Sequence, residues 1–167
     1  MTDRGVKLSW QKVLRVLEHY SDRDVAIQFM QKVIHNNPND VDTYIVMNYL
    51  LMNLLVEEDH DESRHDYYEV LIKNYFDESY AKFSDNPKYL FFTGITTYMS
   101  EWYFGIECNE AQAMLAKTVE LDPKNLLYQW GYHVYSNMSD LNKQLIAIPA
   151  AQEILCDRKE ITSTFFV

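Results

Sequence analysis

The residues best able to do chemistry gather in one acidic segment. Residues 56–66 have the sequence VEEDHDESRHD, which places His60 and His65 among carboxylates. Two histidines on one helical face share a metal ion when they lie three or four positions apart, but these two lie five positions apart. The segment also lacks the alternating ligand positions and central glycine of a helix–loop–helix calcium site. We therefore expect a solvated acidic loop, with no metal and no other cofactor.

Nucleophilic catalysis has no stronger support. Cys108 follows Glu107, and a neighbouring carboxylate disfavours the reactive thiolate. No serine lies in a Gly-x-Ser-x-Gly motif, and the four scattered glycines form no phosphate-binding loop. A helical enzyme that uses His133 or the loop with His60 and His65 is the least favoured hypothesis. We expect a protein that is not an enzyme.

The charge balance restricts the class of partner. Lys and Arg number 15 against 25 Asp and Glu, which gives a net charge of −10. Nucleic acids and anionic membranes require basic surfaces, so neither is expected as a partner, whereas a basic protein is. The chain shows no apolar run of membrane-spanning length and no secretory-signal pattern. Two isolated cysteines, Cys108 and Cys156, fit reduced thiols in a cytoplasmic protein.

Three prolines divide the chain into helices. Pro38, Pro87 and Pro123 lie in the polar clusters HNNPND, SDNPKY and ELDPKN, between apolar-periodic segments. Proline ends a helix because it lacks an N–H group and restricts the residue before it. With only four glycines and four prolines in 167 residues, we predict a single all-α domain of about seven to eight helices. The predicted helices are 8–20, 22–36, 41–56, 64–83, 88–104, 110–121 and 125–138, with an eighth after Ser139 that Pro149 kinks or splits.

Some local details can also be predicted. Ser21 with Asp24, and Asn109 with Gln112, are placed to cap helices. The helix at 64–83 has a potential break near Asp77. The tail at 161–167, ITSTFFV, is β-branched and aromatic and is expected to fold back on the core.

Fixed spacings around two of the prolines indicate a repeat. Ala26 and Ala111 lie twelve residues before Pro38 and Pro123, Met30 and Leu115 lie eight residues before them, and Trp10 lies 28 residues before Pro38. This pattern is similar to that of the tetratricopeptide repeat, a helical hairpin. The resemblance implies antiparallel helix hairpins at about 7–40, 41–91, 92–125 and 126–160, with an acidic insertion at about 56–66. The sequence departs from the pattern where Leu14 and Met99 replace the repeat glycine, and where 49 residues instead of 34 separate Pro38 from Pro87.

The resemblance also indicates a binding surface. In stacked hairpins the first helices line the concave side, where side chains are presented to a partner. The outward positions expected there are Asp42, Ile45, Tyr49, Asn53, Thr96, Ser100 and Tyr103. The acidic residues expected to take part are Glu57, Glu58, Asp59, Asp61 and Glu62. Tyrosine suits such a surface because it gives a large contact area at low entropic cost. For any single tyrosine, helix packing with the hydroxyl in water is the favoured interpretation, whereas the set together with the surplus of acidic residues favours an interface.

These features favour a non-enzymatic protein–protein interaction protein with a basic protein as its partner. One concrete version is an acidic immunity or inhibitor protein that neutralises a small basic toxin such as a nuclease. The alternative is a tetratricopeptide-type adaptor or chaperone that binds a peptide or an assembly partner. The shortage of basic residues on the first helices counts against a clamp for a C-terminal carboxylate.

Overall fold

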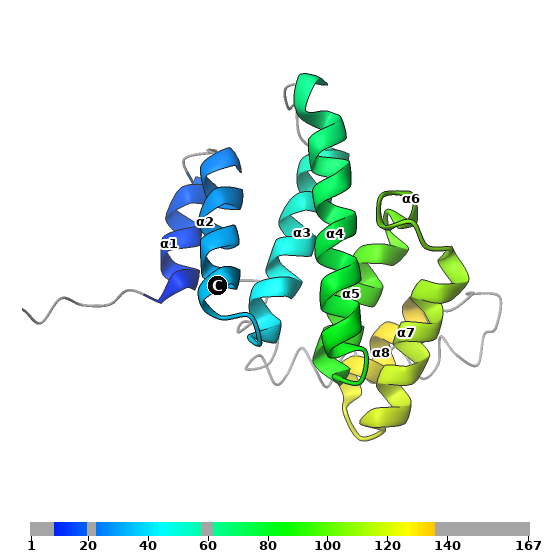
Figure 1. Cartoon of the computed structure of the whole chain (residues 1–167). Coiled ribbons are helices and arrows are strands. Elements are labelled where there is room, and N and C mark those ends of the chain that lie inside the picture. Colours follow the sequence, from blue (N-terminus) through cyan, green and yellow to red (C-terminus); the bar gives the residue numbers. More distant parts are fainter. Residues whose placement is uncertain (1–8, 20–22, 58–61, 136–167) are drawn as a thin grey trace, which may run out of the picture.

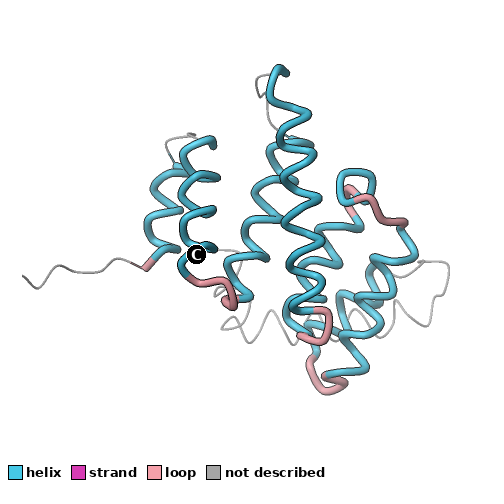
Figure 2. Tube along the Cα trace, in the orientation of Figure 1, coloured by secondary structure: helices cyan, strands magenta, loops and turns pink. Residues whose placement is uncertain are grey.

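All the regular secondary structure in the described part of the chain is helical. The structure, a computed structural model, describes residues 9–19, 23–57 and 62–135 of the 167. Within these residues it has eight α-helices, one 3-10 helix and no strand, which confirms the all-α prediction (Figures 1 and 2). The helices are α1 (Trp10–His19), α2 (Arg23–Asn36), α3 (Val41–Glu57), η1 (Glu62–Arg64), α4 (His65–Phe83), α5 (Pro87–Tyr98), α6 (Glu101–Phe104), α7 (Cys108–Leu121) and α8 (Leu126–Tyr135).

Several predictions concern segments outside the described residues. They are the cap at Ser21, the acidic residues Glu58, Asp59 and Asp61, the thiol of Cys156, the helix after Ser139 with Pro149, and the tail at 161–167.

The three prolines lie where the sequence predicts, between helices. Pro38 and Pro123 occupy turns, and Pro87 is the first residue of α5. Polar neighbours complete each junction: the Asn86 side chain caps α5 by accepting a hydrogen bond from the Tyr89 N–H at 3.1 Å. A proline suits a first helical position because the N–H it lacks has no partner there.

The predicted helix at 88–104 is wrong, because the chain breaks at Met99 and Ser100 into α5 and α6. Hydroxyl groups crowd this point. Thr97 Oγ1 donates to the Thr93 carbonyl at 2.9 Å, and Ser100 Oγ donates to the Thr96 carbonyl at 3.2 Å. Such bonds compete with the helical pattern and bend helices. The break lets α6 turn toward α4.

Two other local predictions are corrected. The helix α4 runs unbroken through Asp77. The helix α7 begins at Cys108, two residues before the predicted start, and its cap is not the pair Asn109 and Gln112. Instead Glu107 and Glu110 form a reciprocal capping box, in which the Glu107 N–H donates to Glu110 Oε2 at 2.8 Å. A glutamate pair closes the helix because each carboxylate accepts an N–H that the first turn leaves free.

Consecutive helices pack as hairpins that follow one another across the molecule. The hairpin of α1 and α2 lies at one end and that of α7 and α8 at the other (Figure 1). The helix α3 packs against α2, α4 and α5, while α5 packs against α7 and α8. Thus α5 contacts both α3 and α8, although other helices separate them along the chain. Small side chains permit close approach, since Ala26 and Ala111 are fully buried.

The core is rich in aromatic residues, and several tyrosines belong to it. Tyr44, Tyr68, Tyr89 and Tyr128 are all buried. A buried polar chain links three helices: the Asn48 amide of α3 donates to Ser79 Oγ of α4, which shares a hydrogen bond with the Tyr89 hydroxyl of α5 at 2.7 Å. For these tyrosines, helix packing and not partner binding is the observed role.

Candidate functional site

The helices α3 and α5 pack in parallel, and the surface that they form is the candidate site. Lys88 Nζ of α5 lies 2.8 Å from Asp42 Oδ1 near the start of α3. Near the end of α3, the Tyr103 hydroxyl donates to the Leu55 carbonyl at 3.3 Å. These two pairs are 46 and 48 residues apart in sequence. Parallel neighbouring helices give a nearly constant difference between the residue numbers of contacting pairs, because both helices advance in the same direction along the contact.

This register aligns two stripes of side chains. The α3 stripe has members at i, i+7, i+11 and i+14, which share one side of a helix of 3.6 residues per turn. The second stripe has the same spacing in sequence, but only Lys88 and Ile95 lie within α5, because the helix ends at Tyr98 and Trp102 belongs to α6. We call the two stripes together the α3–α5 face. Its members are Asp42, Tyr49, Asn53 and Val56 from α3, with Lys88, Ile95, Met99 and Trp102 from α5 and its continuation into α6.

Large apolar side chains of the α3–α5 face are exposed. Trp102 is 61% exposed, Met99 51%, Val56 45% and Tyr49 36%, while Ile95 is half-buried. Single exposed apolar residues are normal on any protein, but a contiguous group is typical of an interaction site. Tyr49 and Val56 belong to α3, Met99 follows the last residue of α5, and Trp102 belongs to α6, which is bonded to the end of α3 through Tyr103.

The position of Trp102 follows from its neighbours in α6. Phe104 is buried against Phe76 of α4, with ring centroids 5.4 Å apart. Two residues correspond to about 200° of helix rotation, so Trp102 points away from α4. Its ring lies 5.7 Å from that of Tyr103, whose hydroxyl reaches the end of α3. Trp102 therefore lies beside the end of the α3 stripe.

The structure corrects part of the predicted surface. Asp42, Tyr49 and Asn53 lie on the α3–α5 face, but Ile45, Thr96 and Ser100 are buried. The hydroxyls of Thr96 and Ser100 donate to carbonyls of the preceding turn, Phe92 and Thr96, and are not presented to a partner.

The predicted positions on α5 are displaced by one residue: Met99 is exposed and Ile95 half-buried, whereas Thr96 and Ser100, which were expected outside, are buried. One residue is about 100° of rotation, enough to move a side chain from surface to core. A usable signal was the spacing of Lys88, Ile95, Met99 and Trp102, which repeats the α3 spacing.

The described residues that remain from the predicted surface are Tyr103, Glu57 and Glu62. Tyr103 is half-buried and its ring also lies 5.9 Å from that of His65. Glu57 is the last residue of α3 and Glu62 the first of η1. Five of the six residues 57–62 are acidic, and this segment follows Val56 directly in the chain. The other end of the face holds the ion pair of Asp42 with Lys88, whose charges cancel.

A second polar cluster is structural. Lys82 Nζ donates to Glu78 Oε1 at 2.6 Å, to the Tyr44 hydroxyl at 2.7 Å and to the Pro38 carbonyl at 3.1 Å. The bond from Lys82 and then that from Tyr44 lower the pKa of Glu78, and the Glu78 carboxylate raises the pKa of Lys82. The bonds from Lys82 attach the α2–α3 turn to α4. Each of the three polar side chains in the cluster has a hydrogen-bond partner, so none is left free to react.

A third polar cluster joins α2 to α4. Asp24 accepts hydrogen bonds from Arg64 and from the Tyr68 hydroxyl. Burial, and then the bond to Asp24, raise the pKa of Tyr68 to about 12. Asp24, expected to cap a helix, thus ties two hairpins together. The sequence around Asp24 does not reveal this role, because its partner Arg64 is 40 residues away in sequence.

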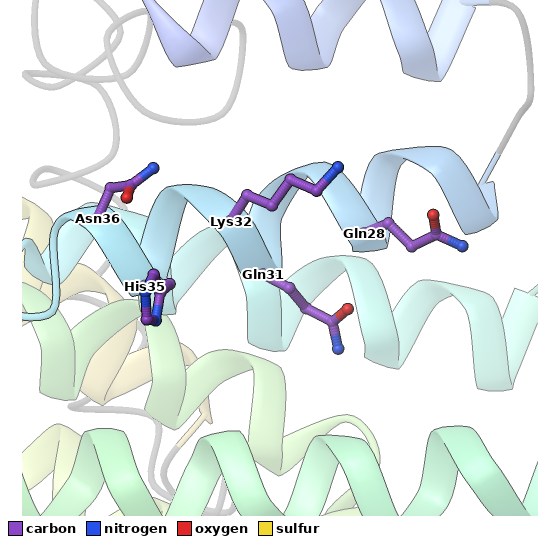
Figure 3. Close-up of a pocket in the computed structure, with 5 residues that line it drawn as sticks. All are labelled: Gln28, Gln31, Lys32, His35 and Asn36. Carbon is purple, nitrogen blue, oxygen red and sulfur yellow. The ribbon is translucent and has the colours of Figure 1, made fainter.

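The polar side of α2 borders an open hollow of about 420 Å³. Its described lining is Gln28, Gln31, Lys32, His35 and Asn36, all from the one helix (Figure 3). These positions are the solvent side of an amphipathic helix, opposite the buried Ala26, Met30 and Val33. The lining offers amide and cationic groups, but they all come from one helix and do not enclose a ligand. The hollow is therefore not a candidate catalytic or ligand-binding site.

In the ranges 9–19, 23–57 and 62–135, no group of three or more His, Cys, Asp or Glu side chains could hold a metal ion. None of the helices in these ranges is long and apolar enough to cross a membrane. Comparison with protein-family models, curated proteins and solved structures found no match.

Proposed function

We propose that this protein acts by binding another protein through the α3–α5 face, without catalysing a reaction. The observation that carries the proposal is the group of four large apolar side chains, 36–61% exposed: Tyr49 and Val56 on α3, Met99 at the end of α5 and Trp102 on α6. Burying such a surface against a partner contributes roughly 25 cal/mol per Å² of apolar area. Exposed Trp and Tyr are the residue types that most often dominate binding energy.

The proposed partner is a basic protein. The chain carries a net charge of −10, and its most acidic segment, 57–62, directly follows Val56 of the face. Opposite charges steer the encounter of two proteins and raise the association rate at low salt. Within this proposal, an inhibitor that covers the basic cleft of a small toxin such as a nuclease is the most specific version.

The proposed scaffold is a tetratricopeptide-like array. Hairpin packing, the buried Ala26 and Ala111, and the contacts of α5 with both α3 and α8 support it. In such an array the first helices of successive hairpins present one continuous surface to a partner.

The test uses the full chain as bait in a lysate of the cells that express it. The wild-type protein is compared with Trp102→Ala and with the control Val70→Ala. Val70 is also 61% exposed, but it lies on α4. We expect a basic protein that wild type and Val70→Ala capture and that Trp102→Ala loses. Circular dichroism confirms that each variant is folded.

The purified partner then gives the affinity. A hot-spot residue costs about 2 kcal/mol or more when truncated, so Kd should rise about 30-fold or more in Trp102→Ala. The association rate should fall as salt is raised. Equal affinity of wild type and Trp102→Ala for every captured protein would overturn the proposal.

A further inference from the structure

We infer that the exposed indole ring of Trp102 binds an arginine side chain of the partner, with the planar guanidinium group stacked on a face of the ring. This inference rests on the proposed function, and it names the type of partner residue that the α6 part of the α3–α5 face recognises.

The backbone that carries Trp102 is fixed on both sides. On the C-terminal side, Phe104 is buried, and the Tyr103 hydroxyl donates to the Leu55 carbonyl at the end of α3. The helix α6 then ends at Gly105, whose φ of 70° lies in the left-handed region that glycine adopts most readily. Because α6 is already ordered, little further ordering of the backbone is needed when Trp102 meets a partner.

The ring itself is accessible to a flat group. Trp102 is 61% exposed. Its described ring neighbour is Tyr103, with the centroids 5.7 Å apart and the planes inclined at 53°. A tilted neighbour does not cover a face of the indole as a stacked ring would, so a planar side chain can lie against it.

The fold already uses contacts between cations and aromatic rings. Arg64 lies over the Tyr68 ring, 5.1 Å from its centroid, and Lys82 lies over the Tyr44 ring at 4.9 Å. Both cations are also paired with carboxylates of their own chain, which holds them at these positions. In the ranges that the structure describes, no cation lies over the Trp102 ring. That ring is therefore left for a cation of the partner.

The chemistry of an exposed indole favours arginine. Among aromatic rings, indole attracts cations most strongly, because its face carries the most negative electrostatic potential. The guanidinium group of arginine is planar and more weakly hydrated than the ammonium group of lysine, so it stacks on a ring with less loss of hydration. Arginine is also among the residue types that dominate binding energy at protein interfaces.

The charges around α6 are compatible with a bound cation. Glu101 directly precedes Trp102 and is the first residue of the helix. Lys73 of α4 lies at the opposite end, where its Nζ would be 3.2 Å from a Cβ atom built at Gly105. The charged residue closest to Trp102 in sequence is thus a carboxylate. The net charge of −10 adds a general attraction for cationic residues.

The probe is the peptide acetyl-Gly-Arg-Gly-Arg-Gly-amide, titrated into the full chain at about 0.15 M salt, which screens the general attraction. Two matched peptides serve as controls. One has citrulline in place of arginine, which keeps the shape and removes the charge, and the other has lysine, which keeps the charge and removes the planar group. Binding is followed by NMR through the indole N–H signal of Trp102, and its loss in Trp102→Leu identifies this signal among those of the three tryptophans.

We expect the arginine peptide to shift the Trp102 indole signal. It should bind about threefold more tightly than the lysine peptide and about fivefold more tightly than the citrulline peptide, because a cation over an exposed ring gains roughly two- to fivefold in affinity. In Trp102→Leu, followed through the backbone amides of residues 101–105, the arginine and lysine peptides should bind equally, since the charges remain and the ring is gone. The control Val70→Ala should behave as the wild type does.

Two results would overturn the inference: a citrulline peptide that binds as tightly as the arginine peptide, or a preference for arginine over lysine that persists in Trp102→Leu. The experiment also separates the inference from the proposed function. If a captured partner requires Trp102 but the arginine peptide binds no better than its controls, the arginine inference fails and the protein-binding function stands. If Trp102→Ala retains every captured protein, the proposed function fails, and the role of a partner arginine fails with it.

Discussion

Replacing Gly131 by alanine tests how α8 packs on α5. A Cβ atom built at Gly131 would lie 2.3 Å from Phe91 Cε2 and 3.0 Å from Phe91 Cζ. Phe91 has little freedom to move, because its ring is buried between those of Phe92 and Tyr128, each with its centroid 5.0 Å away.

Two opposing effects set the magnitude. Alanine is favoured over glycine inside a helix by about 1 kcal/mol. Forcing an extra methyl group into a packed site costs about 1–3 kcal/mol. We therefore expect Gly131→Ala to lower the free energy of unfolding by about 1 kcal/mol, which corresponds to a drop in Tm of roughly 2–4 °C for a chain of this size.

Urea denaturation followed by circular dichroism measures the effect. Gly94→Ala is the matched control, because its added Cβ would lie no closer than 3.1 Å to Leu115, and we expect a smaller loss or none. In a Phe91→Leu background the same Gly131→Ala change should become neutral or stabilising, since the clashing ring is gone. If Gly131→Ala raised the stability of the otherwise unchanged protein by about 1 kcal/mol, the packing described for α5 and α8 would be refuted.

Three further predictions concern stability. Glu78→Gln should reduce the loss of folding stability on going from pH 7 to pH 3.5. The folded-state pKa of Glu78 lies below its usual 4.5, so its bond with Lys82 stabilises the folded state above that pH, and this contribution is lost as the pH falls through the lowered value. Urea denaturation at pH 7 and pH 3.5 measures the two stabilities, and a difference between them as large as that of the wild type would contradict the prediction. Asn86→Ala removes the cap that accepts the Tyr89 N–H and should cost about 1 kcal/mol in urea denaturation, and an effect below 0.3 kcal/mol, roughly the noise of such measurements, would argue against the cap. Met30→Ala empties a fully buried site and should cost about 2–5 kcal/mol by the same method, whereas a cost near that of a surface change would show that Met30 is not in the core.

Much of the secondary structure was visible in the sequence because its causes are local. A proline acts on its own turn, and the apolar spacing of residues such as Ala26 and Met30 shows which side of a helix is buried. Where the predicted helix boundaries were wrong, alternative hydrogen bonds within a few residues compete, and the sequence does not show which of them forms. The break at Ser100 depends on hydroxyls bonding back to the preceding turn, and the cap at Glu107 depends on which of several polar residues supplies the N-terminal carboxylate.

The sequence by itself therefore determined an acidic, all-helical chain divided at Pro38, Pro87 and Pro123, since proline geometry and helical periodicity operate within a few residues. Only the tertiary structure decided which side chains lie together on the α3–α5 face. The α3–α5 face depends on Asp42 meeting Lys88, 46 residues away, and on the rotation that puts Met99 outside and Thr96 inside. No local rule fixes that rotation, because it results from how α5 packs simultaneously on α3, α7 and α8.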